Sequence, residues 1–389
     1  MRLLKITLLL ISSLTVMAGA TVAPALPMMN DHFQNIPNAE FWTKLIITTP
    51  ALFIALFSPI AGWMLDKFSK VKLILGFIIL YALAGASGLV LDNIYWILVS
   101  RAFLGIAVSV IMTGATALVG DYLEGTERTD FLGMQGAFMA FGGTVFVTIA
   151  GYLAGISWRY PFGVYLLAFL ILFLAWRVLY EPQKAEAPSR DHKTKASEPD
   201  SSKSIQYFIY STIFVGMILF YIIPVQSPFL MRSLGAESGL MISLGLIMGT
   251  FFAAIASFFY NRVKKVFHFN QIYAILFTVF GLGFIGVGFA QTPIMVALAT
   301  AFACMGIGWL MPNTSLYLLS LSKPHNRGRI MGGMTGAVFL GQFFSPIALQ
   351  PIVGNVGLSE AHFFAGGFSI LIGLVFFVLV IRKKQKSLQ

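Results

Sequence analysis

The chain alternates between long apolar stretches and short polar connections. Twelve of the stretches approach or exceed the length of about 20 residues that a helix needs to cross the hydrocarbon core of a bilayer. The pattern therefore predicts an all-α integral membrane protein with twelve transmembrane helices. The predicted spans cover residues 6–28, 44–65, 73–91, 95–119, 131–155, 160–179, 207–230, 239–260, 271–290, 293–319, 330–352 and 361–381.

Two features of the first half recur 200 residues later in the second half. Pro24 in the first span is matched by Pro224 in the seventh, and both prolines are expected to bend their helices. The segment 133–137 (Gly-Met-Gln-Gly-Ala) is matched by 333–337 (Gly-Met-Thr-Gly-Ala). Such a repeat predicts two pseudo-symmetric six-helix bundles, related by an axis along the membrane normal, with a binding site between them.

Residues 181–206 interrupt the apolar pattern in the middle of the chain. This segment contains ten charged residues and three prolines, and it has almost no large apolar side chain. It cannot bury enough apolar surface to fold, so its composition predicts a flexible cytoplasmic linker. The linker divides the chain into an N-terminal bundle, residues 1–180, and a C-terminal bundle, residues 207–389.

Composition and charge agree with a lipid-facing protein. Hydrophobic residues make up 58% of the chain and charged residues only 11%, whereas soluble domains carry roughly 25% charged residues. The formal net charge of +11 does not indicate nucleic acid, because 22 of the 26 lysines and arginines lie at the termini and in the even-numbered connections. By the positive-inside rule, this bias predicts a multi-pass protein of the cell (inner or plasma) membrane with both termini in the cytoplasm. The other four cations are Lys44, Arg101, Arg159 and Arg232.

Residues 1–23 also resemble a secretory leader, with Arg2 and Lys5 before an apolar run that ends in small residues. The match between Pro24 and Pro224 favours a first span instead, since removal of residues 1–23 would leave an odd number of spans.

Cys304 is the single cysteine, so no intrachain disulfide can form. No cofactor and no metal ion are predicted.

The connection between the second and third spans holds Gly62, Asp66, Lys67 and Lys70. This spacing resembles motif A of the major facilitator superfamily, and the resemblance extends over the chain through the span count, the central linker and the repeat. A carboxylate at the membrane edge can face the positive N-terminus of another helix. The resemblance implies that Asp66 latches against the eleventh span to shut the cytoplasmic side, and that Lys70 pairs with Asp121. Lys67 is explained equally well by the positive-inside bias.

Arg101 lies about two turns inside the fourth span, where an arginine costs about 2.5–3.5 kcal/mol on insertion scales. Arg101 and Gly105 resemble part of motif B of the bacterial twelve-span drug–proton antiporters. The resemblance implies a role in proton coupling or in the substrate cavity. The alternative is an arginine with a structural role, satisfied by backbone carbonyls and water.

Two features depart from that antiporter branch. All 15 acidic residues and all five histidines fall in predicted loops or at span ends, so no titrating group is expected deep in the membrane. Asp31, at the outer end of the first span, is the nearest candidate, with an ordinary loop carboxylate as the alternative. Motif C of the fifth span is also incomplete, because Gly142 and Gly151 fit its ends while Phe146 and Val147 replace its central Gly-Pro.

The predicted substrate cavity has few polar side chains in apolar surroundings. Such a lining suits a largely apolar or amphipathic solute that a few hydrogen bonds orient. Met17, Met112 and Met311 are expected to pack against lipid or the protein core. The polar candidates are Gln135, Tyr221, Gln226, Trp309, Asn313 and Gln342.

These features predict a secondary transporter that works by alternating access, with the two bundles rocking against each other. The expected activity is proton-coupled efflux of amphipathic small molecules such as drugs, siderophores or metabolites. The alternatives are uptake or facilitated transport of an organic anion recognised by Arg101, and a non-transporting sensor on the same fold.

An intramembrane enzyme is disfavoured because no nucleophile–base pair or paired carboxylates lie at membrane depth. No Walker A motif is present either. The expected partners are the solute, protons and the bilayer, with no nucleic acid, and the protein is expected to act as a monomer.

Overall fold

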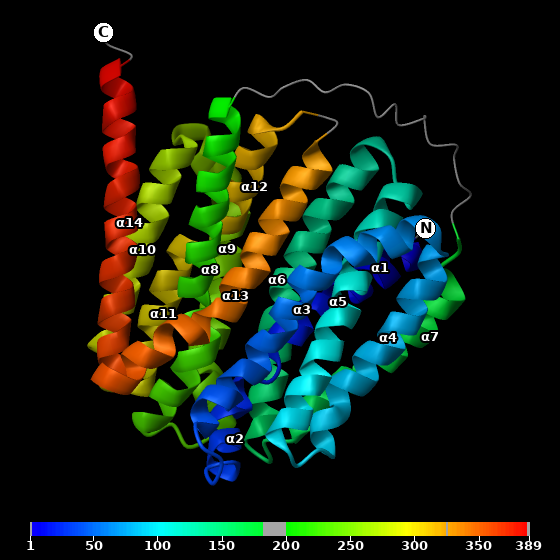
Figure 1. Cartoon of the computed structure of the whole chain (residues 1–389), viewed down its shortest axis with the longest axis horizontal. Helices are drawn as coiled ribbons and strands as arrows, with labels where there is room; N and C mark the ends of the chain where they lie inside the picture. The colour runs from blue at the N-terminus through cyan, green and yellow to red at the C-terminus, as the bar shows by residue number, and fades with distance from the viewer. Residues whose placement is uncertain (1, 182–199, 324–325, 387–389) are drawn as a thin grey trace.

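The computed structural model describes residues 2–181, 200–323 and 326–386. Within these residues, twelve helical stretches are long and apolar enough to cross a membrane. They form two bundles of six spans that lie side by side (Figure 1). The predicted all-α, twelve-span fold is confirmed.

The N-terminal bundle contains the first six spans, three of which include a short 3-10 turn. Its elements are α1 (Arg2–Ala20), η1 (Ala23–Ala25), α2 (Leu26–His32), α3 (Ala39–Lys67), α4 (Lys70–Ala86), η2 (Ser87–Leu89), α5 (Ile94–Tyr122), α6 (Gly125–Ala154), η3 (Tyr160–Leu166) and α7 (Leu167–Val178).

The C-terminal bundle contains the other six spans, one of which is split into two helices. Its elements are α8 (Asp200–Ser233), α9 (Gly239–Val266), α10 (Phe269–Gly288), α11 (Pro293–Ile307), α12 (Leu310–Leu321), α13 (Arg327–Val356) and α14 (Leu358–Lys386).

Several helices extend beyond their predicted spans, because a helix continues into the polar interface after its apolar stretch has ended. The start of α8 is one example, because it lies within the predicted linker. Residues 182–199 lie outside the described residues, whereas residues 200–206, assigned to the linker from the sequence, are helical and begin α8.

The two matched prolines have different surroundings. Pro24 lies in η1, which interrupts the first span between α1 and α2 and is buried. Pro224 lies inside α8, which remains one helix. The first span is an integral part of the bundle: Leu8 and Leu14 of α1 are fully buried, and the Tyr81 hydroxyl donates to the carbonyl oxygen of Leu14 at 2.8 Å.

The spans alternate in direction, so the first and last described residues lie at the same end of the molecule. We call this the terminal end; it also contains the connections α3–α4, α5–α6, α9–α10 and α12–α13. The opposite end contains the connections α2–α3, α4–α5, α6–α7, α8–α9, α10–α11 and α13–α14. The two bundles meet mainly where α6 packs on α9 and α3 packs on α13 (Figure 1).

Candidate functional site

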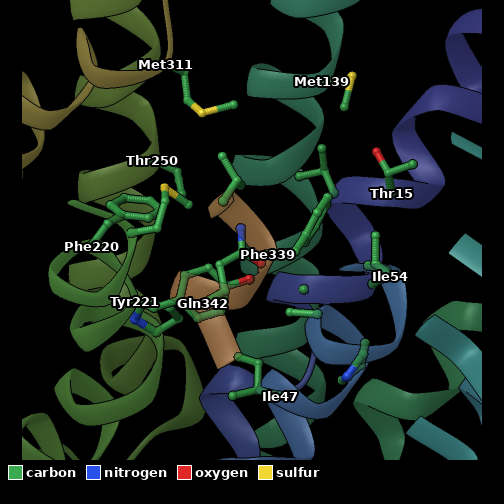
Figure 2. Close-up of a pocket in the computed structure, with 18 of the residues that line it drawn as sticks. Thr15, Ile47, Ile54, Met139, Phe220, Tyr221, Thr250, Met311, Phe339 and Gln342 are labelled. Atoms are coloured by element: carbon green, nitrogen blue, oxygen red, sulfur yellow. The ribbon is translucent and has the colours of Figure 1, made fainter. Parts of the chain in front are cut away.

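A cavity of about 520 Å³ lies between the two bundles. This volume is within the range of about 300–1,000 Å³ that is usual for small-molecule sites. Figure 2 shows side chains of both bundles around one space, with Thr15 and Ile54 on one side and Phe220 and Tyr221 on the other. α13 contributes Gln342 to the wall.

The lining of this cavity is neutral. None of the described residues that form it carries a charge, and its hydrogen-bonding groups are few. Methionine side chains are flexible and polarisable, so they adapt to apolar ligands of different shape. Met112 and Met311 belong to the lining, which corrects the expectation that they pack against lipid or core. The six methionines of the wall are Met112, Met139, Met217, Met311, Met331 and Met334.

Two of the six predicted polar cavity residues, Tyr221 and Gln342, lie on the wall, together with Pro224. The other four lie outside the lining. The Gln135 amide donates to the Ser12 hydroxyl at 2.5 Å and so joins α6 to α1. Gln226 is 1% exposed, and neither of its side-chain polar atoms has a hydrogen-bond partner among the described residues.

The structure corrects the placement of Trp309 and Asn313 at the cavity. Trp309 Nε1 donates to the carbonyl oxygen of Ala256 at 2.9 Å. Asn313 accepts from the Tyr260 hydroxyl at 3.0 Å and donates to the carbonyl oxygen of Phe269 at 3.2 Å. Both side chains therefore hold helices of the C-terminal bundle together. The span is interrupted between α11 and α12, so a continuous helical register does not predict which face of α12 points inward.

Arg101 is 1% exposed and lies inside the N-terminal bundle, away from the cavity. Its Nη2 atom donates to the carbonyl oxygens of Ala84 and Gly85 at 2.8 and 2.6 Å. Its guanidinium carbon lies 4.9 Å from the ring centre of Phe162 and 5.2 Å from that of Tyr165. The carbonyls of a last helical turn lack intrahelical partners and carry the negative end of the helix dipole. Arg101 thus caps α4, as the structural alternative expects, and it does not line the cavity in this conformation.

The glycines of the motif B-like and motif C-like segments have different surroundings. A Cβ on Gly105 would overlap the carbonyl oxygen of Pro50, so this glycine permits close packing of α5 on α3. A Cβ on Gly151 would overlap the hydroxyl of Ser243 on α9, so Gly151 permits the contact between the bundles. Gly142 has only ordinary contacts with its neighbours.

The start of α4 is held by two carboxylates at the terminal end. Lys70 Nζ lies 2.5 Å from Asp121 Oδ2, the partner expected from the sequence. Glu181 accepts from the Ser69 hydroxyl at 2.5 Å and from the backbone amides of Lys70 and Val71 at 2.8 and 3.1 Å. Burial alone would raise the pKa of the Glu181 carboxyl, but these hydrogen bonds outweigh burial and lower its pKa. Glu181 is not among the residues predicted from the sequence, although an acid directly after a span is a signal for such a cap.

Asp66 does not engage α13 in this conformation. Its side chain is exposed, and it makes no ion pair or hydrogen bond with the residues that the structure describes. A Cβ on Gly62 would meet no atom within 4 Å. Lys67 lies with its Nζ 4.6 Å from the ring centre of Trp63 on its own helix. The latch that the sequence predicts between Asp66 and α13 is therefore not formed here.

The two ends of the interface between the bundles differ. At the opposite end, a Cβ on Gly239 of α9 would overlap the backbone of Gly151 on α6. Towards the terminal end, Cβ atoms on Gly136 of α6 and Gly336 of α13 would meet no atom within 4 Å. Along α13, the cavity lining continues from Gln342 to Met331, towards the terminal end. The bundles are therefore closed against each other at the opposite end, and the cavity extends towards the terminal end.

Two polar contacts between the bundles also lie at the opposite end. Asp31 of α2, the predicted titrating residue, forms an ion pair with Arg232 of α8. Lys44 of α3 donates to Gln350 Oε1 of α13 at 2.8 Å. In the sequence, Lys44 stands out only as a cation away from the termini and the even-numbered connections, although a lysine within an apolar span is itself a signal for a specific partner.

Comparison with known proteins identifies the family. The sequence profile of the Major Facilitator Superfamily matches residues 8–270 and 208–389 of the chain. The chain belongs to this superfamily. The multi-drug resistance efflux pump PmrA of Streptococcus pneumoniae is 22% identical over 395 residues, which span 95% of each protein. The quinolone resistance protein NorA of Staphylococcus aureus is 23% identical over 353 residues, which span 88% of each.

Solved structures of the superfamily have the same fold. A D-xylose–proton symporter superposes with a TM-score of 0.78 at 15% sequence identity, over 96% of this chain and 97% of the other. A POT family peptide transporter superposes with a TM-score of 0.78 at 12% identity, over 98% and 97%. The predicted resemblance to the superfamily and to its drug-efflux branch is confirmed by these matches. The chain is accordingly a multi-pass membrane transporter and not an enzyme.

Proposed function

We propose that this transporter exports amphipathic small molecules, of the class that includes drugs, siderophores and metabolites, by alternating access driven by protons. The observation that carries the proposal is the neutral, methionine-rich cavity between the two bundles. Apolar and aromatic walls with a few fixed polar groups suit ligands that are mostly apolar. Relatives named as multi-drug and quinolone resistance proteins support the same class of solute.

The orientation follows from the distribution of charge. Most lysines and arginines lie at the terminal end, so the positive-inside rule places this end, with both termini, in the cytoplasm. The cavity then extends towards the cytoplasm, from which an exporter takes up its solute. The protein would act as a monomer in the cell (inner or plasma) membrane.

The lining also indicates what the solute looks like. The Tyr221 hydroxyl and the Gln342 amide are the groups best placed to orient it, while methionines and Phe220 contact its apolar part. Recognition of an organic anion by Arg101 is disfavoured, because Arg101 is bound to carbonyls of α4 and no described lining residue is a cation.

The transport cycle uses the contacts between the bundles. Solute enters the cavity from the terminal end, and the bundles then rock so that Asp66 approaches the start of α13 and closes that end. The contacts of Gly151 with Gly239 and of Asp31 with Arg232 separate at the opposite end and release the solute. Return of the bundles to the conformation described here completes the cycle.

The test is a flux assay in proteoliposomes with an imposed pH gradient and a proton-sensitive dye. Ethidium, a neutral lipophilic drug and an organic anion are added in turn. We expect solute-dependent proton movement with ethidium or the neutral drug and none with the anion. Absence of flux for every solute would contradict export and would favour the sensor alternative.

A matched pair of variants assigns the flux to the cavity. Gln342→Leu removes a cavity hydrogen bond and should raise KM by about three- to tenfold, because one neutral hydrogen bond contributes about 0.5–1.5 kcal/mol. Gln291→Leu makes the same exchange at an exposed position between α10 and α11 and should leave KM unchanged. Equal KM values for both variants would remove Gln342 from the substrate site.

A further inference from the structure

The interface at the opposite end buries a lysine completely. The Lys44 side chain has no exposed surface. Its ammonium group forms an ion pair with Glu40 one turn earlier on α3, donates to Gln350 Oε1 at 2.8 Å, and lies 4.8 Å from the ring centre of Phe229. Burial of a charge is costly unless the charge is paired and hydrogen-bonded. The contacts of Lys44 therefore have to be kept whenever this end is closed.

The partners of Lys44 come from both bundles. Glu40 belongs to α3 of the N-terminal bundle, whereas Gln350 lies on α13 and Phe229 on α8 of the C-terminal bundle. Separation of α3 from α13 and α8 would break the bond to Gln350 and bring Lys44 into water. The burial of Lys44 thus reports directly whether the opposite end is closed.

Other buried polar groups lie between Lys44 and the cavity. Thr48 is one turn further along α3 in the direction of the cavity, and Gln226 is nearly one turn before Phe229 on α8. Both are buried, and their side-chain polar atoms have no hydrogen-bond partner among the described residues. Neither bundle therefore supplies a hydrogen-bond partner for the side chains of Thr48 and Gln226 in this conformation.

Glu40 and Lys44 differ in their access to water. The Glu40 side chain is 39% exposed, while that of Lys44 is fully buried. A proton from the side that the opposite end faces can reach Glu40 without any movement of the bundles. Once Glu40 is neutral, the ammonium group of Lys44 remains as a buried charge without a counter-ion. Removal of one partner of a buried pair strongly destabilises the state that buries the other.

The other charged groups around this site have partners or lie elsewhere. On α2, Asp31 is paired with Arg232 of α8, and His32 is bonded to Asp92. The described charged residues of α13 lie at the terminal end, as do those of α1 and α4. On α5, Arg101 is turned towards α4 and Asp121 is paired with Lys70. Glu40 is the carboxylate that compensates Lys44.

We propose that Glu40 is a proton-binding site that controls the opposite end: the ionised Glu40–Lys44 pair permits closure, and protonation of Glu40 opens this end. The proton joins the Glu40 carboxylate, the hydrogen bond from Lys44 to this oxygen is lost, and the lysine keeps its charge. Glu40 lies in the first turn of α3, before the predicted second span, so the site is at the edge of the membrane segment. The inference rests on the proposed alternating-access function and specifies what releases its outward gate.

The experiment follows opening with a cysteine that is buried only in the closed state. Ser243 of α9 is fully buried against Gly151, so Ser243→Cys in a Cys304→Ala background reports separation of α6 from α9. A membrane-impermeant maleimide is added in vesicles from the side that the opposite end faces. The exposed Asn355→Cys variant corrects for the pH dependence of thiol reactivity. We expect the corrected labelling rate to rise about tenfold when the pH on that side is lowered from about 7 to about 4.

Three variants separate the proton site from a general loosening of the interface. Glu40→Gln should label rapidly at every pH, since it leaves Lys44 unpaired. Lys44→Met should label slowly at every pH, and the double variant Glu40→Gln/Lys44→Met should label as slowly, because no charge is left to bury. Asp31→Asn, which cuts the neighbouring ion pair, should keep the pH response.

Several results would overturn the inference. A flat profile in the wild type, a pH response that survives in Glu40→Gln, or a double variant that labels as rapidly as Glu40→Gln would each do so. Ethidium flux measured in the same vesicles separates this failure from that of the proposed function. A flat labelling profile with intact flux removes the proton site and leaves export, whereas responsive labelling without any flux removes export.

Discussion

Arg101 illustrates what a single residue reveals in a sequence and what it does not. The sequence shows that an arginine within a membrane span is costly and needs a partner. It does not show that the partners are the carbonyl oxygens of Ala84 and Gly85, because those residues are small and carry no polar side chain. The structural role follows only when the end of α4 is placed beside α5.

The position of Arg101 leads to a prediction about stability. Arg101→Gln should lower the free energy of unfolding by about 2 kcal/mol, since a hydrogen bond to a charged group contributes about 1.5–3 kcal/mol. The KM of the folded fraction for ethidium should not change, because the residue does not line the cavity. Thermal unfolding in detergent and flux in proteoliposomes measure the two quantities. Unaltered stability together with a raised KM would return Arg101 to the substrate site.

The polar cavity candidates show why individual side chains were hard to place. In a soluble helix, alternation of polar and apolar residues reveals the inward face. In a membrane span, the side that faces lipid and the side that faces protein are both apolar, so this signal is weak. Tyr221 and Gln342 lie on the cavity wall, but Trp309 and Asn313 bond to neighbouring helices. Residue type predicted a polar role for all four, and only packing decides between cavity and core.

At the scale of elements, the number of spans was predictable because length and apolarity alone define a membrane helix. The ends were less predictable, since α8 begins at Asp200 within the predicted linker. The interruption between α11 and α12, near Gly308 and Trp309, also has no hydrophobic signature. Breaks of this kind depend on how neighbouring helices satisfy the freed backbone groups.

The helices α6 and α9 allow a prediction with a matched pair of glycines. Gly151→Val places side-chain atoms where Ser243 and the backbone of α9 already lie, so it should force the opposite end open. A Cβ on Gly136, on the same helix, would meet no atom within 4 Å, so Gly136→Val should leave the present conformation intact. The rate of maleimide labelling at Ser243→Cys measures both effects. A labelling rate that is unchanged in Gly151→Val would show that this contact does not hold the opposite end closed.

For the whole molecule, the 200-residue repeat predicted two bundles with a binding site between them, and the structure has two bundles with a cavity between them. The conformational state was not predictable, because two arrangements of the same bundles differ only in a small set of contacts. Here those contacts include the ion pair of Asp31 with Arg232 and the bond from Lys44 to Gln350 at the opposite end. The free Asp66 marks the terminal end as open.

We propose that the two ends of the molecule open in turn around one cavity. Spin labels at Lys72 and Lys323 report the distance across the terminal end, and labels at Gln34 and Asn355 report it across the opposite end. Distances are measured in nanodiscs, without ligand at neutral pH and with ethidium at acidic pH. We expect the terminal-end distance to shorten while the opposite-end distance lengthens, in the same fraction of molecules. Two distances that change in the same direction, or that stay fixed while the protein still transports ethidium, would contradict it.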